Sequence, residues 1–149
     1  MKPHLLFIKH KDFNARTVDN DLYILNENFS VTIKNVNTTK GFSFFTAFIR
    51  QFFYLLFNTY RFKVVFIWFG DYHSLLPVFF AKLFGKPCIL NIGGYDADEI
   101  LIGEPKSLKA KFRKFCVKYS VKNATKLLPV SNLIKEYLIA PPVLPKGEE

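Results

Sequence analysis

Two glycines, a tyrosine and a carboxylate, Gly93-Gly94-Tyr95-Asp96, directly follow the apolar run Cys88–Ile92. Glycine is used where the backbone turns with positive φ or where another molecule approaches it closely. An ionised carboxylate accepts hydrogen bonds, including those from sugar hydroxyls. The segment therefore has two interpretations. It is either a tight turn or a loop in which a sugar or phosphate lies against Gly93 and Gly94 while Asp96 accepts from its hydroxyls.

Two further apolar runs also end in residues that could do chemistry. Ser131 follows Lys126–Val130 and is expected at a helix N-terminus, where a hydroxyl either caps the helix or helps to hold an anion. Asp71 and His73 follow Val64–Phe69 in the same way. A single histidine at this place is either a residue of the helix start or a binding or catalytic group.

The first polar loop, His10–Thr17, contains His10 and Arg16. Arginine suits phosphate because its guanidinium donates two parallel hydrogen bonds, although exposure to solvent is the commoner explanation for such a residue. The candidate substrate-binding residues are Gly93, Gly94, Asp96, Ser131, Arg16 and His73. No catalytic residue is identified among them.

Several established fingerprints are missing from the sequence. It contains no GxGxxG, no GxxxxGK[ST] and no GxSxG, so neither a nucleotide-binding loop nor a nucleophile elbow is indicated. No second histidine or cysteine lies at metal-ligand spacing, and no metal site is predicted. Cys88 and Cys116 have no CxxC neighbour and are expected to be buried thiols in a reducing compartment.

Strands that alternate with helices must position these residues. Hydrophobic periodicity predicts strands at Leu5–Ile8, Phe29–Val36, Val64–Phe69, Cys88–Ile92 and Lys126–Val130, and helices at Val18–Asn28, Phe42–Tyr60, His73–Phe84, Ser107–Lys122 and Ser131–Leu138. Near-continuous apolar strands separated by helices indicate an α/β fold, a Rossmann-like parallel sheet with helices on both faces. In such sheets ligands bind outside the carboxyl ends of the strands, so the polar loops above are expected to share one crevice.

Composition limits the kind of partner. The 149 residues carry 21 Lys and Arg against 12 Asp and Glu, a net charge of +9, which favours nucleic acid, a phosphorylated small molecule or an anionic membrane. Half of the residues are hydrophobic, enough for a folded core. We expect one Rossmann-like domain at residues 1–140 and a polar, Pro-rich tail at 141–149. No signal-peptide pattern follows Met1, which predicts a cytoplasmic protein.

The segment from Pro105 to Lys135 is strongly basic, with nine basic residues and no acidic one. On its helix, Phe112, Phe115 and Tyr119 are expected on the buried side. This would leave no exposed aromatic ring for a base to stack on, and nucleic acid is therefore disfavoured. An anionic membrane surface fits the charge better.

The predicted helix Phe42–Tyr60 is apolar around most of its circumference. Arg50 and Gln51 lie at its middle, and a charge there disfavours a membrane span. Either neighbouring helices cover the apolar surface that the sheet does not, or the helix dips into a membrane interface. The second alternative predicts peripheral association with a membrane.

The chain resembles the N-terminal half of GT-B glycosyltransferases of the family 4 type. The resemblance lies in the opening strand and loop, in Leu83-Phe84-Gly85-Lys86-Pro87, in Gly93-Gly94-Tyr95-Asp96, and in Asn123-Ala124-Thr125-Lys126-Leu127-Leu128-Pro129-Val130-Ser131. It implies one half of a GT-B fold, in which two Rossmann-like domains face each other across a cleft. The N-terminal domain binds the acceptor, and a C-terminal domain binds the nucleotide-sugar donor.

The resemblance further implies a hexosyltransferase that retains the configuration of the sugar and needs no metal or other cofactor. Its acceptor would be a glycan or a lipid-linked intermediate, and the protein would be peripheral on the inner membrane face. The sequence stops after Pro145 and a short tail, before the donor domain would begin, so the chain alone is expected to be inactive. The first loop lacks the glycines of many relatives, and Tyr95 stands where they have a histidine nearby.

Two alternatives remain open from the residues. One is a membrane-docking or partner-binding α/β module without catalysis, which would use the basic helix and the Phe-rich helix. The other is a flavodoxin-like domain that binds a phosphorylated cofactor by itself.

Overall fold

The computed structural model describes residues 1–12, 16–37, 42–94, 96, 105–132 and 135. Within these residues, five parallel strands form one sheet in the order β2-β1-β3-β4-β5. The strands are β1 (His4–His10), β2 (Ser30–Val36), β3 (Val64–Trp68), β4 (Cys88–Ile92) and β5 (Lys126–Pro129). The predicted α/β fold with a parallel, Rossmann-like sheet is confirmed.

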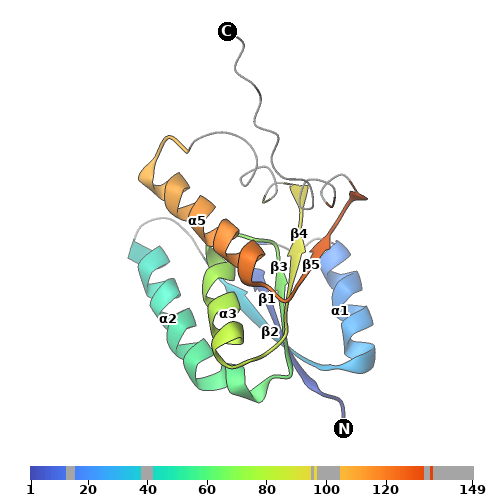
Figure 1. The fold of residues 1–149 in the computed structure, drawn as a ribbon. Helices are drawn as coiled ribbons and strands as arrows, with labels where there is room; N and C mark the ends of the chain where they lie inside the picture. The colour runs from blue at the N-terminus through green and yellow to red at the C-terminus, as the bar shows by residue number, and fades with distance from the viewer. Residues whose placement is uncertain (13–15, 38–41, 95, 97–104, 133–134, 136–149) are drawn as a thin grey trace.

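Helices lie on both faces of this sheet (Figure 1). They are α1 (Arg16–Asn28), α2 (Phe42–Asn58), α3 (Tyr72–Leu83) and α5 (Leu108–Asn123), with a short 3₁₀ turn η1 (Thr59–Arg61) after α2. Helix α1 covers one face, and α2, α3 and α5 cover the other. The predicted bounds agree with these to within two residues.

The end of the chain falls mostly outside the described residues. The predicted helix Ser131–Leu138 is described only in part, where the amide of Lys135 donates to the carbonyl of Ser131 at 3.1 Å, as in one helical turn. The predicted tail at 141–149 lies outside the described residues.

The alternation of side chains along the strands produces two hydrophobic clusters. Leu6 and Ile8 of β1 point to the α2, α3 and α5 side, whereas Leu5 and Phe7 point to the α1 side. On the α1 side, Phe7 stacks on Phe66 of β3 with ring centroids 5.3 Å apart. Both faces of the central strands are buried, which explains why these strands read as continuous apolar runs.

Helix α3 begins and ends where its sequence requires. Asp71 is its N-cap, and its carboxylate accepts from the amide of Tyr72 at 2.7 Å. Gly85, with φ of 62°, follows the last turn, a conformation that favours glycine over any residue with a Cβ.

The prediction that the aromatic stripe of α5 lies on its buried side is wrong. Phe115 is 56% exposed, and Leu108 and Phe112 are exposed too, so the aromatic stripe expected on the buried side faces largely outward. The buried side carries Cys116, Val117 and Ser120 instead. These smaller residues let α5 approach α3 closely, and the hydroxyls of Ser74 and Ser120 lie 2.8 Å apart.

Replacing Phe80 by alanine is expected to destabilise the fold by about 3–5 kcal/mol, because this fully buried ring packs on Phe52 and Phe84. The neighbouring Phe79 is half exposed, and Phe79→Ala should change the free energy of unfolding by less than about 1 kcal/mol. Urea unfolding of both variants measures the difference. Equal losses would contradict the packing described for α3.

Candidate functional site

A cavity of about 300 Å³ opens at the carboxyl edge of the sheet, within the volume range of small-molecule sites. The residues that follow β1, β3 and β4 line it, together with one residue of α5. They are His10, Trp68, Phe69, Gly70, Asp71, His73, Gly93, Asp96 and Arg113. The strand order reverses its direction between β1 and β3, and ligands of open α/β sheets bind at such a switch point.

Phe69 has a strained backbone at this cavity. Its φ is 64°, which is uncommon for a residue with a bulky side chain and is found mainly where function or packing enforces it. Its ring lies against Gly93. A Cβ added at Gly93 would come within 2.2 Å of Cε1 of Phe69. Gly93 is therefore needed for the approach of a protein ring.

The two glycines thus differ in their roles. Neither has a positive φ, so neither position requires glycine for its backbone conformation. Gly94 is exposed, and a Cβ there would meet no atom of the described residues within 4 Å. The approach of a sugar or phosphate to this pair stays a prediction, and the approach seen at Gly93 is that of the Phe69 ring.

Asp96 is a buried carboxylate, only 3% exposed. Its Oδ2 accepts a hydrogen bond from the amide of Gly70 at 2.8 Å. This bond joins the segment after β4 to the segment after β3. Asp96 therefore presents its carboxylate at a fixed place in the cavity wall.

His73 lies in the first turn of α3 and is almost fully buried. Its Nε2 lies 3.1 Å from the carbonyl oxygen of Trp68, which can only accept, so Nε2 carries the proton. Among the described residues, Nδ1 has no hydrogen-bond partner. Burial lowers the pKa of His73, which favours the neutral ring with Nδ1 as an acceptor.

Asp71 and Arg113 form a bidentate ion pair across the cavity wall. Arg113 Nε donates to Asp71 Oδ1 at 2.9 Å, and Nη2 donates to Oδ2 at 2.7 Å. The pair joins the start of α3 to α5, and both side chains are about a quarter exposed. Because the two charges are matched, this part of the wall offers polar atoms without a free positive charge.

Aromatic and imidazole rings complete the lining. The rings of Trp68 and Phe69 meet edge to face at 4.2 Å, and the indole Nε1 donates to Asp21 of α1 at 2.7 Å. His10 ends β1, and its ring centroid lies 6.2 Å from that of His73. The cavity thus combines carboxylates, imidazoles and apolar ring surface.

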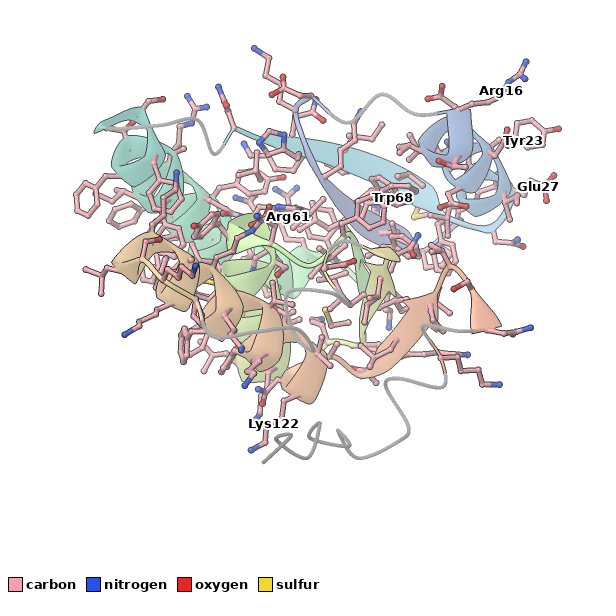
Figure 2. All side chains as sticks on the ribbon, turned by 90° about the horizontal axis from the view of Figure 1, so that it is seen from above. Arg16, Tyr23, Glu27, Arg61, Trp68 and Lys122 are labelled. Atoms are coloured by element: carbon pink, nitrogen blue, oxygen red, sulfur yellow. The ribbon has the colours of Figure 1, made fainter. Side chains whose placement is uncertain are left out.

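Three predicted site residues meet in this cavity and three do not. His73, Gly93 and Asp96 line it. Ser131 lies at the same edge, since the amide of Val130 donates to the carbonyl of Ile92 at 3.0 Å, but it is exposed and outside the lining. Gly94 also lies outside the lining, and Arg16 points outward from the start of α1, away from Trp68 (Figure 2).

Sequence reasoning missed part of the lining. Trp68 carried a usable signal, because it is the one tryptophan in the chain and is next to the last residue of an apolar run. Arg113 carried none, since it is 42 residues from its partner Asp71 in the sequence. The backbone strain of Phe69 cannot be read from a sequence.

Metal and thiol chemistry find no support at this site. The described residues contain no group of three His, Cys, Asp or Glu side chains that could hold a metal ion. Cys88 and Cys116 are free and buried, as predicted, and burial raises the pKa of each thiol to about 12. Neither cysteine lines the cavity.

No protein-family model, curated protein or solved structure matches this chain. The resemblance to family 4 glycosyltransferases therefore rests on the quoted residues. None of the described helices is both long enough and apolar enough to cross a membrane.

Acidification is expected to weaken the fold through His73. Its pKa is lowered from the ordinary 6.5, so below that pH the unfolded chain binds a proton at His73 that the folded chain excludes. The stability it contributes is complete above pH 6.5 and is lost below it, by at most about 1.4 kcal/mol per pH unit. In urea unfolding over a pH series, the free energy of unfolding of His73→Gln should fall less steeply below pH 6.5 than that of the wild type.

The control for this measurement is His4→Gln, because His4 is exposed at the amino end of β1. It should keep the wild-type pH dependence. A wild-type slope in His73→Gln would show that His73 is not the group that titrates.

Gly93→Ala is expected to displace the ring of Phe69 and to destabilise the fold by about 1–3 kcal/mol, as overpacking does. Gly94→Ala is the matched control and should change stability by no more than about 0.5 kcal/mol. Thermal or urea unfolding distinguishes the two. Similar losses at both positions would contradict the account of the glycine pair.

Proposed function

We propose that the cavity binds a sugar hydroxyl face of an acceptor, and that this chain is the acceptor-binding half of a retaining glycosyltransferase. The donor would be a nucleotide sugar, bound mainly by a second domain, and the acceptor a glycan or a lipid-linked sugar. The observation that carries this proposal is the cavity at the switch point of the sheet, with Asp71, Asp96, His10 and His73 around an aromatic wall.

The chemistry of the lining supports a neutral, hydroxylated ligand. Carboxylate oxygens and the unprotonated Nδ1 of His73 accept hydrogen bonds from hydroxyls. The rings of Trp68 and Phe69 offer apolar surface for the carbon face of a sugar. Anionic ligands are less suited, because Asp71 already neutralises Arg113.

In this proposal, the chain contributes to catalysis by positioning. Fixing one acceptor hydroxyl next to the donor replaces an encounter of two free molecules, which lowers the barrier substantially. Asp96 and His73 are the groups best placed to orient that hydroxyl, since both are held by backbone hydrogen bonds. Stabilising the leaving phosphate would fall to the donor domain.

A second candidate is favoured by the strand order. The order β2-β1-β3-β4-β5 is that of flavodoxin-like domains, which bind a phosphorylated cofactor at the switch between β1 and β3. Two carboxylates and a paired arginine make the described lining a poor phosphate site. We therefore place this candidate second.

The proposal predicts saccharide binding that depends on His10. Calorimetric titration with a panel of glucose, galactose, mannose and N-acetylglucosamine, as methyl glycosides and disaccharides, should find at least one ligand. His10→Ala should weaken its Kd about two- to tenfold, the equivalent of one hydrogen bond.

His4→Ala is the matched control, because it removes the same side chain from the opposite end of β1. It should leave the Kd unchanged. Absence of binding across the panel, or equal effects of both variants, would contradict the proposal. A flavin or nucleotide retained through purification would favour the second candidate instead.

A further inference from the structure

The helices on the α2, α3 and α5 side carry an exposed apolar surface. Its side chains are each between about a third and five-sixths exposed, and seven of the ten are phenylalanines. We call them the aromatic face: Phe45, Ile49, Phe52, Phe53 and Phe57 of α2, Phe79 and Leu83 of α3, and Leu108, Phe112 and Phe115 of α5. Neighbouring rings are in contact, such as Phe53 on Phe57 and Phe112 on Phe115.

The size of the aromatic face is unusual. An aromatic side chain has about 150–250 Å² of surface, so ten side chains exposed by about half amount to an area on the order of 1,000 Å². The largest apolar patch on a typical monomer is about 300–600 Å². A face of this size indicates a surface that is covered by a partner.

The charge of these helices is of one sign. Together, α2, α3 and α5 contain eight Lys and Arg residues and no acidic residue. Helix α1, on the opposite face of the sheet, has three acidic residues and one basic residue. The described helices on the two faces of the sheet thus carry net charges of opposite sign.

Cations and rings lie side by side on α5. Lys111, Lys118 and Lys122 are exposed and lie within a narrow sector of the helix, next to Phe115 and Leu108. Figure 2 shows Lys122 at the outer surface of α5, on the side of the molecule away from α1. Lysines that flank an exposed aromatic stripe are typical of helices that lie in a membrane interface.

We propose that the aromatic face docks the protein on an anionic lipid surface, with α2, α3 and α5 lying in the interface. A second copy of the chain is a poor occupant, because it would bring two strongly positive faces together. Nucleic acid is also a poor occupant, because α2 offers it five exposed apolar residues and only Arg50 as a cation. An anionic bilayer can bury the exposed rings at its interface and attract the lysines to its headgroups. The proposal does not depend on what the cavity binds.

Vesicle co-sedimentation tests this proposal with the full chain. The protein should bind vesicles that contain phosphatidylcholine and phosphatidylglycerol, and it should bind pure phosphatidylcholine vesicles more weakly. Raising the salt concentration should partly dissociate the protein from the anionic vesicles. Lys111→Gln, Lys118→Gln and Lys122→Gln together should weaken binding to the anionic vesicles, by on the order of fivefold per lysine.

The aromatic contribution needs its own variant and control. The double variant Phe53→Ser/Phe57→Ser should reduce vesicle binding at least tenfold, because it removes two exposed rings from the C-terminal part of α2. Tyr23→Ser/Ile24→Ser is the matched control, since these exposed residues lie on α1. It should bind like the wild type. Circular dichroism and urea unfolding check that both variants are folded.

Three outcomes would overturn the proposal. The first is absence of binding to anionic vesicles at low salt. The second is binding that Tyr23→Ser/Ile24→Ser weakens as much as the α2 variant does. The third is that vesicles do not bind, while the chain binds a mixed-sequence oligonucleotide, or self-associates in the ultracentrifuge, in a way that depends on Phe53 and Phe57. Nucleic acid or a second copy would then be the occupant.

Discussion

Because the five described strands all run in one direction, the segments that follow β1, β3 and β4 are brought to one edge of the sheet. Local chemistry alone would not bring His10, Asp71 and Asp96 together, since they are far apart in the sequence. The register of the parallel ladder does so. The Oδ2 of Asp96 then fixes the amide of Gly70, and the cavity acquires a wall shared by two strand ends.

The charged and strained groups at this edge stabilise one another. Arg113 holds Asp71 by two hydrogen bonds, Asp71 caps α3, and the first turn of α3 places His73 under the carbonyl of Trp68. Gln51 of α2 adds a hydrogen bond to the carbonyl of His73 at 3.0 Å. A site built in this way is preorganised, which is what a positioning role in catalysis needs.

Much of the fold, but less of the site, could be predicted from the sequence. The periodicity of β3, β4 and α3 is a local signal, and it predicted the bounds of these elements nearly to the residue. Which side of α5 faces inward is a tertiary outcome. The small residues of α5, such as Ser120, face inward because they fit against α3, and the larger aromatic stripe faces outward. The same limit explains why the pairing of Arg113 with Asp71, and the packing of Phe69 on Gly93, were not foreseen.

The cavity at the carboxyl edge is the centre of the proposed function, and amide chemical shifts test it most directly. On titration with a saccharide that binds, we expect shift changes to concentrate at His10, Gly70 and Gly93, which follow β1, β3 and β4. Gly85, which precedes the amino end of β4, should not respond. Shift changes centred at Gly85, or spread evenly over the sheet, would contradict a ligand site at the switch point.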